Sequence, residues 1–193
     1  LRRNGYREQF SQEEINLVFG RKWKDIFESK IPNREKFLYE RLEAQAFQQA
    51  TDNFEGVNRY LQRNDHIEEV LSKISRKGHE QILISNVTPD NLERFIHALQ
   101  LDRFFSKNKR YAVTSNNGEN PKIQALKAFL DNSKESFTDI ITIGDREGDI
   151  ELVHVSGGVS YLYAHPGRSF QECRGDITPD YKINNITEIL REL

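Results

Sequence analysis

Polar side chains of a kind that can handle a phosphate group follow two apolar segments of this 193-residue sequence. Ser85 and Asn86 come directly after one segment, Asp145 and Asp149 follow another, and Lys122 lies between the two along the chain. Carboxylate oxygens are typical ligands of Mg²⁺, whereas a hydroxyl, a backbone amide and a lysine can hold phosphate oxygens and neutralise developing charge. These residue types therefore predict a site for magnesium and phosphate.

Each of these residues also has an ordinary structural interpretation. A serine after a strand is usually a turn or cap residue, and a lone lysine is usually solvated. Two acidic residues four apart commonly open a helix, whose dipole favours negative charge there. Only the ordered set favours a functional site, because each member is expected at the exit of a predicted strand. The strands must then lie side by side for the residues to meet.

Helices and short apolar strands alternate after Gly56. The predicted strands are residues 81–84, 111–113, 139–143, 159–163 and 181–183. The predicted helices begin near residues 65, 89, 121, 148 and 186. This alternation is typical of an α/β domain with a Rossmann-like parallel sheet sandwiched by helices, and ligands bind beyond the carboxyl ends of such strands. Lys122 is expected in the loop before the helix that opens at Pro121.

The first part of the chain has helical patterns and no convincing strand. Ser11–Glu14 has the spacing of a capping box, and residues from Phe37 to Leu42 include apolar side chains at helical intervals. We therefore expect a small all-helical unit at residues 1–56, followed by the α/β unit at residues 57–193.

Composition argues against several classes of function. The chain has 28 Lys+Arg and 30 Asp+Glu, a net charge of −2, so it offers no net positive field to a nucleic acid. No apolar run approaches the roughly 18 residues of a membrane span, and no signal peptide opens the sequence. One cysteine cannot form an internal disulfide, and the five histidines lack zinc-site spacing. We expect a cytoplasmic monomer or homodimer with no nucleic-acid or membrane partner.

The order of these motifs resembles the haloacid dehalogenase superfamily. The resemblance rests on Ser85-Asn86 after one strand, a lysine between the strands, and the run from Gly144 to Asp149, which reads Gly-Asp-Arg-Glu-Gly-Asp. The phosphoglycolate-phosphatase-like branch with a helical cap is the most similar. Residues 57–193 then resemble the core, and residues 1–56 resemble the cap in length and position.

The resemblance implies a Mg²⁺-dependent phosphatase of a small phosphorylated metabolite, acting through a phospho-aspartyl intermediate. It implies that Ser85 and Asn86 bind phosphate and that Lys122 steadies the phosphorylated intermediate, which makes Ser85 and Lys122 the catalytic candidates. It also implies that Asp145 and Asp149 hold the Mg²⁺ ion. The cap would close over the site and select the substrate.

The nucleophile motif of that superfamily, Asp-x-Asp at the end of the first strand, has no counterpart in this sequence. Asp52 follows a polar helical stretch and is no substitute. The sequence contains no methionine and begins at Leu1. We therefore expect about twenty residues upstream of Leu1, enough for one strand, its active-site turn and a linker.

Two alternatives to a phosphatase stay open. A phosphomutase of the same superfamily would use the same core, and a member without a nucleophile would serve as a binding or regulatory protein. Lys127 is a weaker candidate for the site lysine, and the loop His165–Gly167 is a candidate for the rim of the site. A receiver domain is rejected because its acidic pair precedes its hydroxyl and lysine, which is the reverse of the order here.

Overall fold

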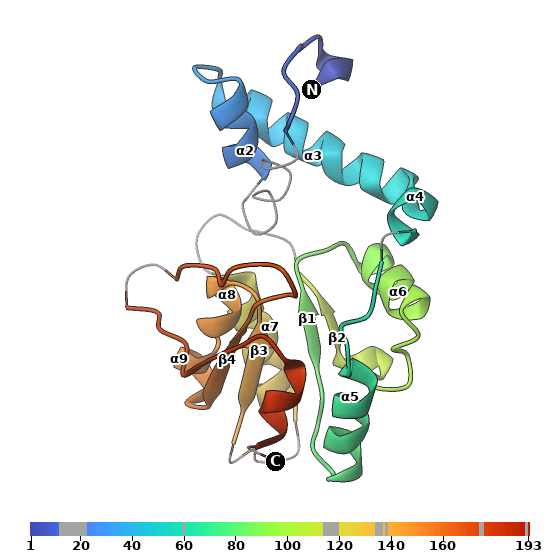
Figure 1. The fold of residues 1–193 in the computed structure, drawn as a ribbon, viewed down its shortest axis with the longest axis vertical. Coiled ribbons are helices and arrows are strands. Elements are labelled where there is room, and N and C mark those ends of the chain that lie inside the picture. The colour runs from blue at the N-terminus through green and yellow to red at the C-terminus, as the bar shows by residue number, and fades with distance from the viewer. Residues whose placement is uncertain are drawn as a thin grey trace. The chain divides into compact units, whose positions relative to one another are not determined.

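The computed structural model divides the chain into two compact units, Leu1–Tyr60 and Leu61–Leu193, which Figure 1 shows as a ribbon. Each unit has its own cluster of buried apolar side chains. The structure describes residues 1–11, 23–59, 61–113, 120–133, 137, 139–173, 176–191 and 193.

The first unit is helical where it is described. Its core consists of Phe27, Ile31, Tyr39 and Leu42. The Tyr39 hydroxyl donates a hydrogen bond to the Ile31 carbonyl at 2.8 Å, which satisfies the one polar atom of this core residue. The helix predicted after Ser11 lies outside the described residues. The elements are η1 (Arg2–Asn4), α2 (Trp23–Lys30), α3 (Lys36–Asp52) and α4 (Phe54–Asn58).

The second unit alternates helices with short strands, as the sequence predicts. The elements are α5 (Ile67–Arg76), β1 (Leu83–Ser85), α6 (Pro89–Ala98), η2 (Lys107–Lys109), β2 (Arg110–Ala112), α7 (Pro121–Asn132), β3 (Ile141–Gly144), α8 (Glu147–Ile150), α9 (Val153–Ser156), β4 (Val159–Tyr163), β5 (Tyr181–Ile183) and η3 (Ile186–Arg191). Parallel strands flanked by helices confirm the predicted α/β Rossmann-like class.

All strand pairs are parallel, but they form two sheets. β1 pairs with β2, and β3, β4 and β5 pair in that order, with Ile84 opposite Tyr111 and Ile143 opposite Tyr161. Among the described residues, β1 and β3 therefore each keep one edge without a hydrogen-bonded strand. The alternation of helices and strands predicts one parallel sheet, whereas the structure has two. The reason is that β1 and β3 do not form hydrogen bonds with each other.

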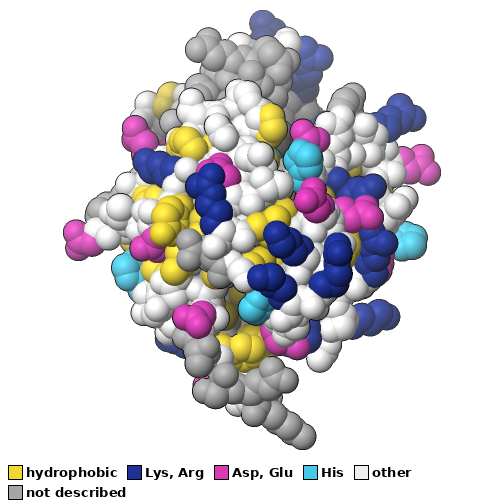
Figure 2. Space-filling view, turned by 60° about the horizontal axis from the view of Figure 1, so that its bottom comes forward, with side chains coloured by type: hydrophobic (Ala, Val, Ile, Leu, Met, Phe, Trp, Pro, Cys, Tyr) yellow, Lys and Arg dark blue, Asp and Glu magenta, His cyan; other side chains and the backbone are white. Residues whose placement is uncertain are grey.

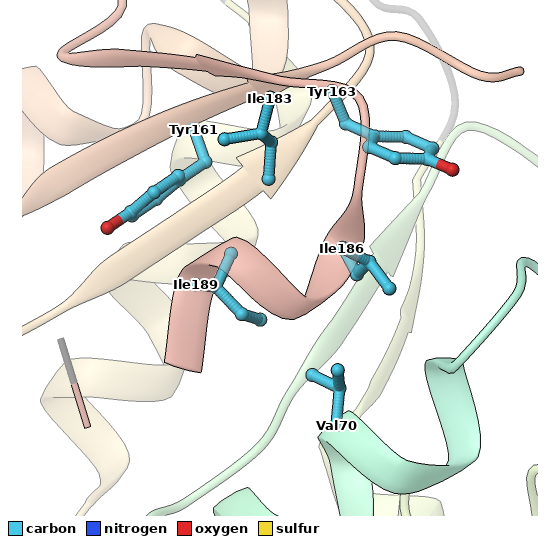
Figure 3. Close-up of a cluster of buried hydrophobic side chains, with 6 residues drawn as sticks. All are labelled: Val70, Tyr161, Tyr163, Ile183, Ile186 and Ile189. Carbon is cyan, nitrogen blue, oxygen red and sulfur yellow. The ribbon is translucent and has the colours of Figure 1, made fainter. Parts of the chain in front are cut away.

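Two clusters of buried apolar side chains, which combine residues of helices and strands, stabilise the second unit. Figure 3 shows the larger cluster, in which α5, β4, β5 and η3 meet. Val70 of α5 and Tyr161 of β4 are 0% and 2% exposed, so this cluster is closed to solvent. A second cluster centres on Ile123 and Leu126 of α7, and Ile84 of β1 packs against it. Burying each such apolar side chain stabilises the unit by about 2 kcal/mol.

Two local expectations are wrong. Lys122 lies in the first turn of α7 rather than in the loop before it, because the side chain of Asn120 caps this helix and accepts a hydrogen bond from the Lys122 amide at 3.1 Å. The helix expected near Gly148 is split into the two short helices α8 and α9. The chain closes with η3, a 3₁₀ helix.

The surface mixes charges of both signs. Figure 2 shows basic and acidic side chains side by side on one face of the molecule. The structure pairs several of them, including Arg103 with Glu68, and Lys109 with Glu80. No helix within the described parts of the chain combines the length and the apolar character needed to cross a membrane.

Candidate active site

The structure places the predicted site residues at the ends of β1 and β3 and at the start of α7. Ser85 is the last residue of β1, and Asp145 follows the last residue of β3. Ile84, the residue before Ser85, packs against the cluster that contains Ile123, the residue after Lys122. In Figure 1 the end of β1 and helix α8 both lie on the upper side of the second unit. The fold therefore places these elements at one end of the strands.

Lys122 and Asp149 form an ion pair between α7 and α8. The Lys122 Nζ contacts the Asp149 Oδ1, and the two side chains are only 12% and 11% exposed. The second oxygen, Oδ2, accepts a hydrogen bond from the Arg146 amide at 3.1 Å. Both carboxylate oxygens of Asp149 are thus engaged by the protein. In this arrangement Asp149 holds the lysine in place, a role that the sequence pattern did not distinguish from metal binding.

Asn120 joins the start of α7 to α8. Its Nδ2 donates to the Gly148 carbonyl at 2.7 Å and to the Glu151 Oε2 at 2.9 Å. Its Oδ1 accepts from the Lys122 amide at 3.1 Å. One amide side chain therefore fixes both the helix that carries the lysine and the turn that carries the acid. Sequence reasoning found Asn120 only as a helix start.

Two glycines leave room for this arrangement. A Cβ on Gly144 would lie 2.2 Å from the Cβ, Cγ and Oδ2 of Asp149, a separation that non-bonded atoms do not tolerate. A Cβ on Gly148 would lie 3.2 Å from the Nδ2 of Asn120. The glycine that precedes Asp145 is therefore explained by the close approach of Asp149 to the strand end.

Asp145 is the more accessible of the two acids. Its side chain is 43% exposed, and its two oxygens lie 4.0 Å from the Arg146 Nε and 3.9 Å from the His165 Nε2. The His165 ring packs edge-on against the ring of Tyr163, with the centroids 4.9 Å apart. The loop after β4 thus reaches Asp145, in agreement with the prediction that His165–Gly167 lies at the rim of the site. It puts a second basic group beside the Asp145 carboxylate.

These groups suit magnesium better than zinc. Within the described ranges no three His, Cys, Asp or Glu side chains gather into a metal-binding group. Zinc needs such a protein cage, whereas Mg²⁺ is held by one or two carboxylates and completes its shell with substrate phosphate and water. Asp145, an exposed hard-oxygen ligand at a strand end, fits that requirement. Binding of Mg²⁺ by Asp145 and Asp149 stays a prediction.

Ser85 and Asn86 are placed at the same end of the strands but are not tied to the other candidates. Ser85 is half-buried and Asn86 is exposed. The Ser85 carbonyl accepts from the amides of Val87 and Val113, at 3.0 Å and 2.9 Å, so the backbone here is fixed. Among the described residues, no hydrogen bond joins the Ser85 or Asn86 side chain to Lys122 or the acids. Their phosphate-binding role stays a prediction.

A thiol nucleophile does not fit the structure. Burial raises the pKa of the Cys173 thiol and the nearby Glu147 carboxylate raises it further, while the weaker opposing effect of Lys182 leaves the pKa raised. A nucleophilic cysteine needs the opposite, a lowered pKa beside a positive group. Lys127 is exposed on α7, away from the buried pair that Lys122 forms. Lys122 is therefore the lysine that the geometry favours.

The model of the haloacid dehalogenase-like hydrolases matches residues 1–158. The chain belongs to this family. No curated protein sequence matches the chain. The match makes the chain a member of a family of hydrolases.

Solved structures share the whole fold at low sequence identity. A haloacid dehalogenase-like family protein of Streptococcus pneumoniae has a TM-score of 0.72 at 15% identity, covering 99% of this chain and 85% of its own. A predicted phosphoglycolate phosphatase of Haemophilus somnus has 0.68 at 16%, covering 95% and 83%. Protein tyrosine kinase A of Mycobacterium tuberculosis has 0.72 at 12%, covering 100% and 85%. At such identities, and with such different names, these likenesses show the fold alone.

Proposed function

We propose that this protein is a Mg²⁺-dependent phosphatase of a small phosphorylated metabolite. The observation that carries the proposal is the ion pair of Lys122 with Asp149, held beside the exposed carboxylate of Asp145 at the ends of parallel strands. A lysine and a metal-binding carboxylate on one rim are suited to a phosphate dianion. Membership of a hydrolase family supports the same conclusion.

The burial and contacts of each residue suggest its role in the proposed reaction. Lys122 is nearly buried and is held by Asp149, so its positive charge has a fixed position. A charge that is fixed in advance and shielded from water stabilises a transferring phosphoryl group most strongly. Asp145, half-exposed, is the proposed ligand of Mg²⁺, and bound Mg²⁺ would polarise the phosphoryl group. Ser85 and the amide of Asn86 would hold phosphate oxygens at the end of β1.

The reaction also needs an attacking carboxylate, because Asp145 and Asp149 already have other roles. We propose that it comes from a strand not contained in these 193 residues, which pairs with the open edges of β1 and β3. Ile143, on β3, is 40% exposed, an unusual state for an apolar strand residue that an added strand would cover. The end of such a strand would lie between Ser85 and Asp145.

The proposed reaction has two steps. The carboxylate oxygen bonds to phosphorus while the bond between phosphorus and the substrate oxygen breaks, and that oxygen leaves with a proton from a neighbouring acid. Water then gives a proton to that same group and attacks the phosphorus of the phospho-aspartyl group. The bond between phosphorus and the carboxylate oxygen breaks, which releases inorganic phosphate and restores both the carboxylate and the acid. Lys122 faces the charge that develops in both steps.

Phosphate release from a panel of small phosphate monoesters, measured with and without Mg²⁺ on the protein that includes the proposed nucleophile strand, tests the proposal. We expect turnover that EDTA abolishes and Mg²⁺ restores, and an Asp145→Asn variant about 100-fold slower. Asp131→Asn, an exposed acid near the end of α7, is the matched control and should match the wild type. Absence of turnover on every ester would contradict the proposal, as would full activity of Asp145→Asn. Transfer of phosphate between two positions of a sugar, without release, would indicate a mutase instead.

A further inference from the structure

The amide side chain of Asn120 does more than cap α7. An N-cap needs only an acceptor, and the Oδ1 of Asn120 fills that need by accepting from the Lys122 amide. The other half of the amide, Nδ2, points across to α8 and donates to the Gly148 carbonyl and the Glu151 carboxylate. An aspartate or serine would cap the helix equally well without these two bonds. The cap alone therefore does not account for the amide.

A comparison within the chain makes the difference concrete. α6 and α7 begin in the same way, with an N-cap residue followed by proline: Thr88-Pro89 and Asn120-Pro121. The Thr88 Oγ1 accepts from the Asn91 amide at 3.4 Å, which caps α6, and among the described residues this is its one hydrogen bond. Asn120 adds a donor that reaches a residue 28 positions away.

Gly148 supports the same interpretation. Glycine in a helix costs about 1 kcal/mol relative to alanine. A Cβ at Gly148 would lie 3.2 Å from the Asn120 Nδ2, closer than ordinary van der Waals contact. Glycine therefore keeps open the space that the amide occupies. The glycine at position 148 is therefore explained by the space that the Asn120 side chain needs and not by the stability of α8.

We infer that Asn120 is a positioning residue, which sets the distance between Lys122 on α7 and Asp149 on α8. Lys122 is two residues after Asn120, and Asp149 directly follows the carbonyl that Asn120 binds. The bonds of one short, rigid side chain thus fix both backbones next to the ion pair. Catalysis is sensitive to displacement of a charged group by about 1 Å. The inference rests on the proposed phosphatase function.

The test separates the two halves of the amide. Asn120→Asp keeps the capping acceptor but puts a carboxylate where Nδ2 had faced a carbonyl and a second carboxylate. We expect its kcat to fall by about 10- to 100-fold with KM changed less than about twofold, since a misplaced lysine affects mainly the transition state. Thr88→Ala, which removes the matched cap on α6, should keep the wild-type kcat.

Two further measurements distinguish positioning from a structural role. In a Lys122→Met background, Asn120→Asp should add less than about a twofold loss, because the residue acts through the lysine. Gly148→Ala should leave the urea midpoint unchanged or higher, since alanine favours a helix, and yet lower kcat. This variant keeps the test valid where Asn120→Asp fails to fold.

The outcomes differ for the inference and for the function on which it rests. If the wild type turns over no phosphate ester, the proposed function fails. If the wild type is active and both Asn120→Asp and Gly148→Ala keep its kcat, the function stands and the inference is overturned. Equal losses of kcat with and without Lys122 would overturn it as well, because Asn120 would then act independently of the lysine.

Discussion

Replacing Gly144 by alanine tests the close approach on which the site depends. In the absence of a clash, alanine in a strand is better than glycine by about 0.5–1 kcal/mol. The structure predicts the opposite sign. The new Cβ would lie 2.2 Å from three atoms of Asp149, and one of these is the Asp149 Cβ, which cannot move without its backbone.

The cost follows from what must be displaced. Overpacking a well-filled position costs about 1–3 kcal/mol. Moving Asp149 also weakens its contacts with Lys122 and with the Arg146 amide, and hydrogen bonds to charged groups are worth about 1.5–3 kcal/mol each. We therefore expect Gly144→Ala to destabilise the segment around β3 and α8 by about 3–5 kcal/mol.

Hydrogen–deuterium exchange read by peptide measures this locally, which matters because the chain has two units. A loss of about 3 kcal/mol makes exchange in peptides covering residues 141–155 about 100-fold faster, while peptides of the first unit stay unchanged. Asp149→Gly removes the three clashing atoms, so adding Gly144→Ala to that background should cost less than about 1 kcal/mol. The steric reasoning fails if Gly144→Ala exchanges as the wild type does, or costs as much without Asp149.

Three other substitutions distinguish residues that stabilise the fold from residues that act in the proposed reaction. Lys122→Ala leaves the nearly buried Asp149 carboxylate without its cation and should lower the free energy of unfolding by about 2–3 kcal/mol in urea titrations, a loss that Asp149→Asn should partly restore. Asp145→Asn, at an exposed carboxylate, should change that free energy by less than about 0.5 kcal/mol, so a larger loss would show a structural role. Ser160→Ala removes the hydroxyl that, together with the Ser160 amide, lowers the pKa of the Asp180 carboxyl from 3.8. Because that pKa is lowered on folding, its stabilising contribution is complete above pH 3.8 and is lost as the pH falls through the lowered value. Asp180 is exposed, and solvent screens its interactions, so the wild type and Ser160→Ala should differ by less than about 1 kcal/mol at pH 7, and the difference should shrink in acid.

The strands of the second unit were predictable because a short apolar run bounded by polar residues is typical of a buried strand. β4 and β5 begin and end at the predicted residues, Val159–Tyr163 and Tyr181–Ile183. Parallel strands also place the residues that follow them at one end, so the motif residues after β1 and β3 were found without knowledge of the packing.

The contacts inside the site were not predictable in the same way. The pairing of Lys122 with Asp149, and the bond from Asn120 to Gly148, depend on how closely α7 approaches α8, and the sequence does not contain that distance. A local signal for one of them was present. Asn120 before a proline is a strong helix cap, and it places Lys122 inside the helix rather than before it.

The open edges of β1 and β3 have a consequence for how this polypeptide behaves in solution. An unpaired strand edge displays free amides and carbonyls on which another chain can add a strand, and an exposed apolar side chain such as Ile143 strengthens that tendency. The strands are only three and four residues long, which limits the number of bonds such an encounter can form. A substitution that exposes these strand edges should therefore cause self-association that increases with protein concentration. This self-association should be detectable before the helix content falls.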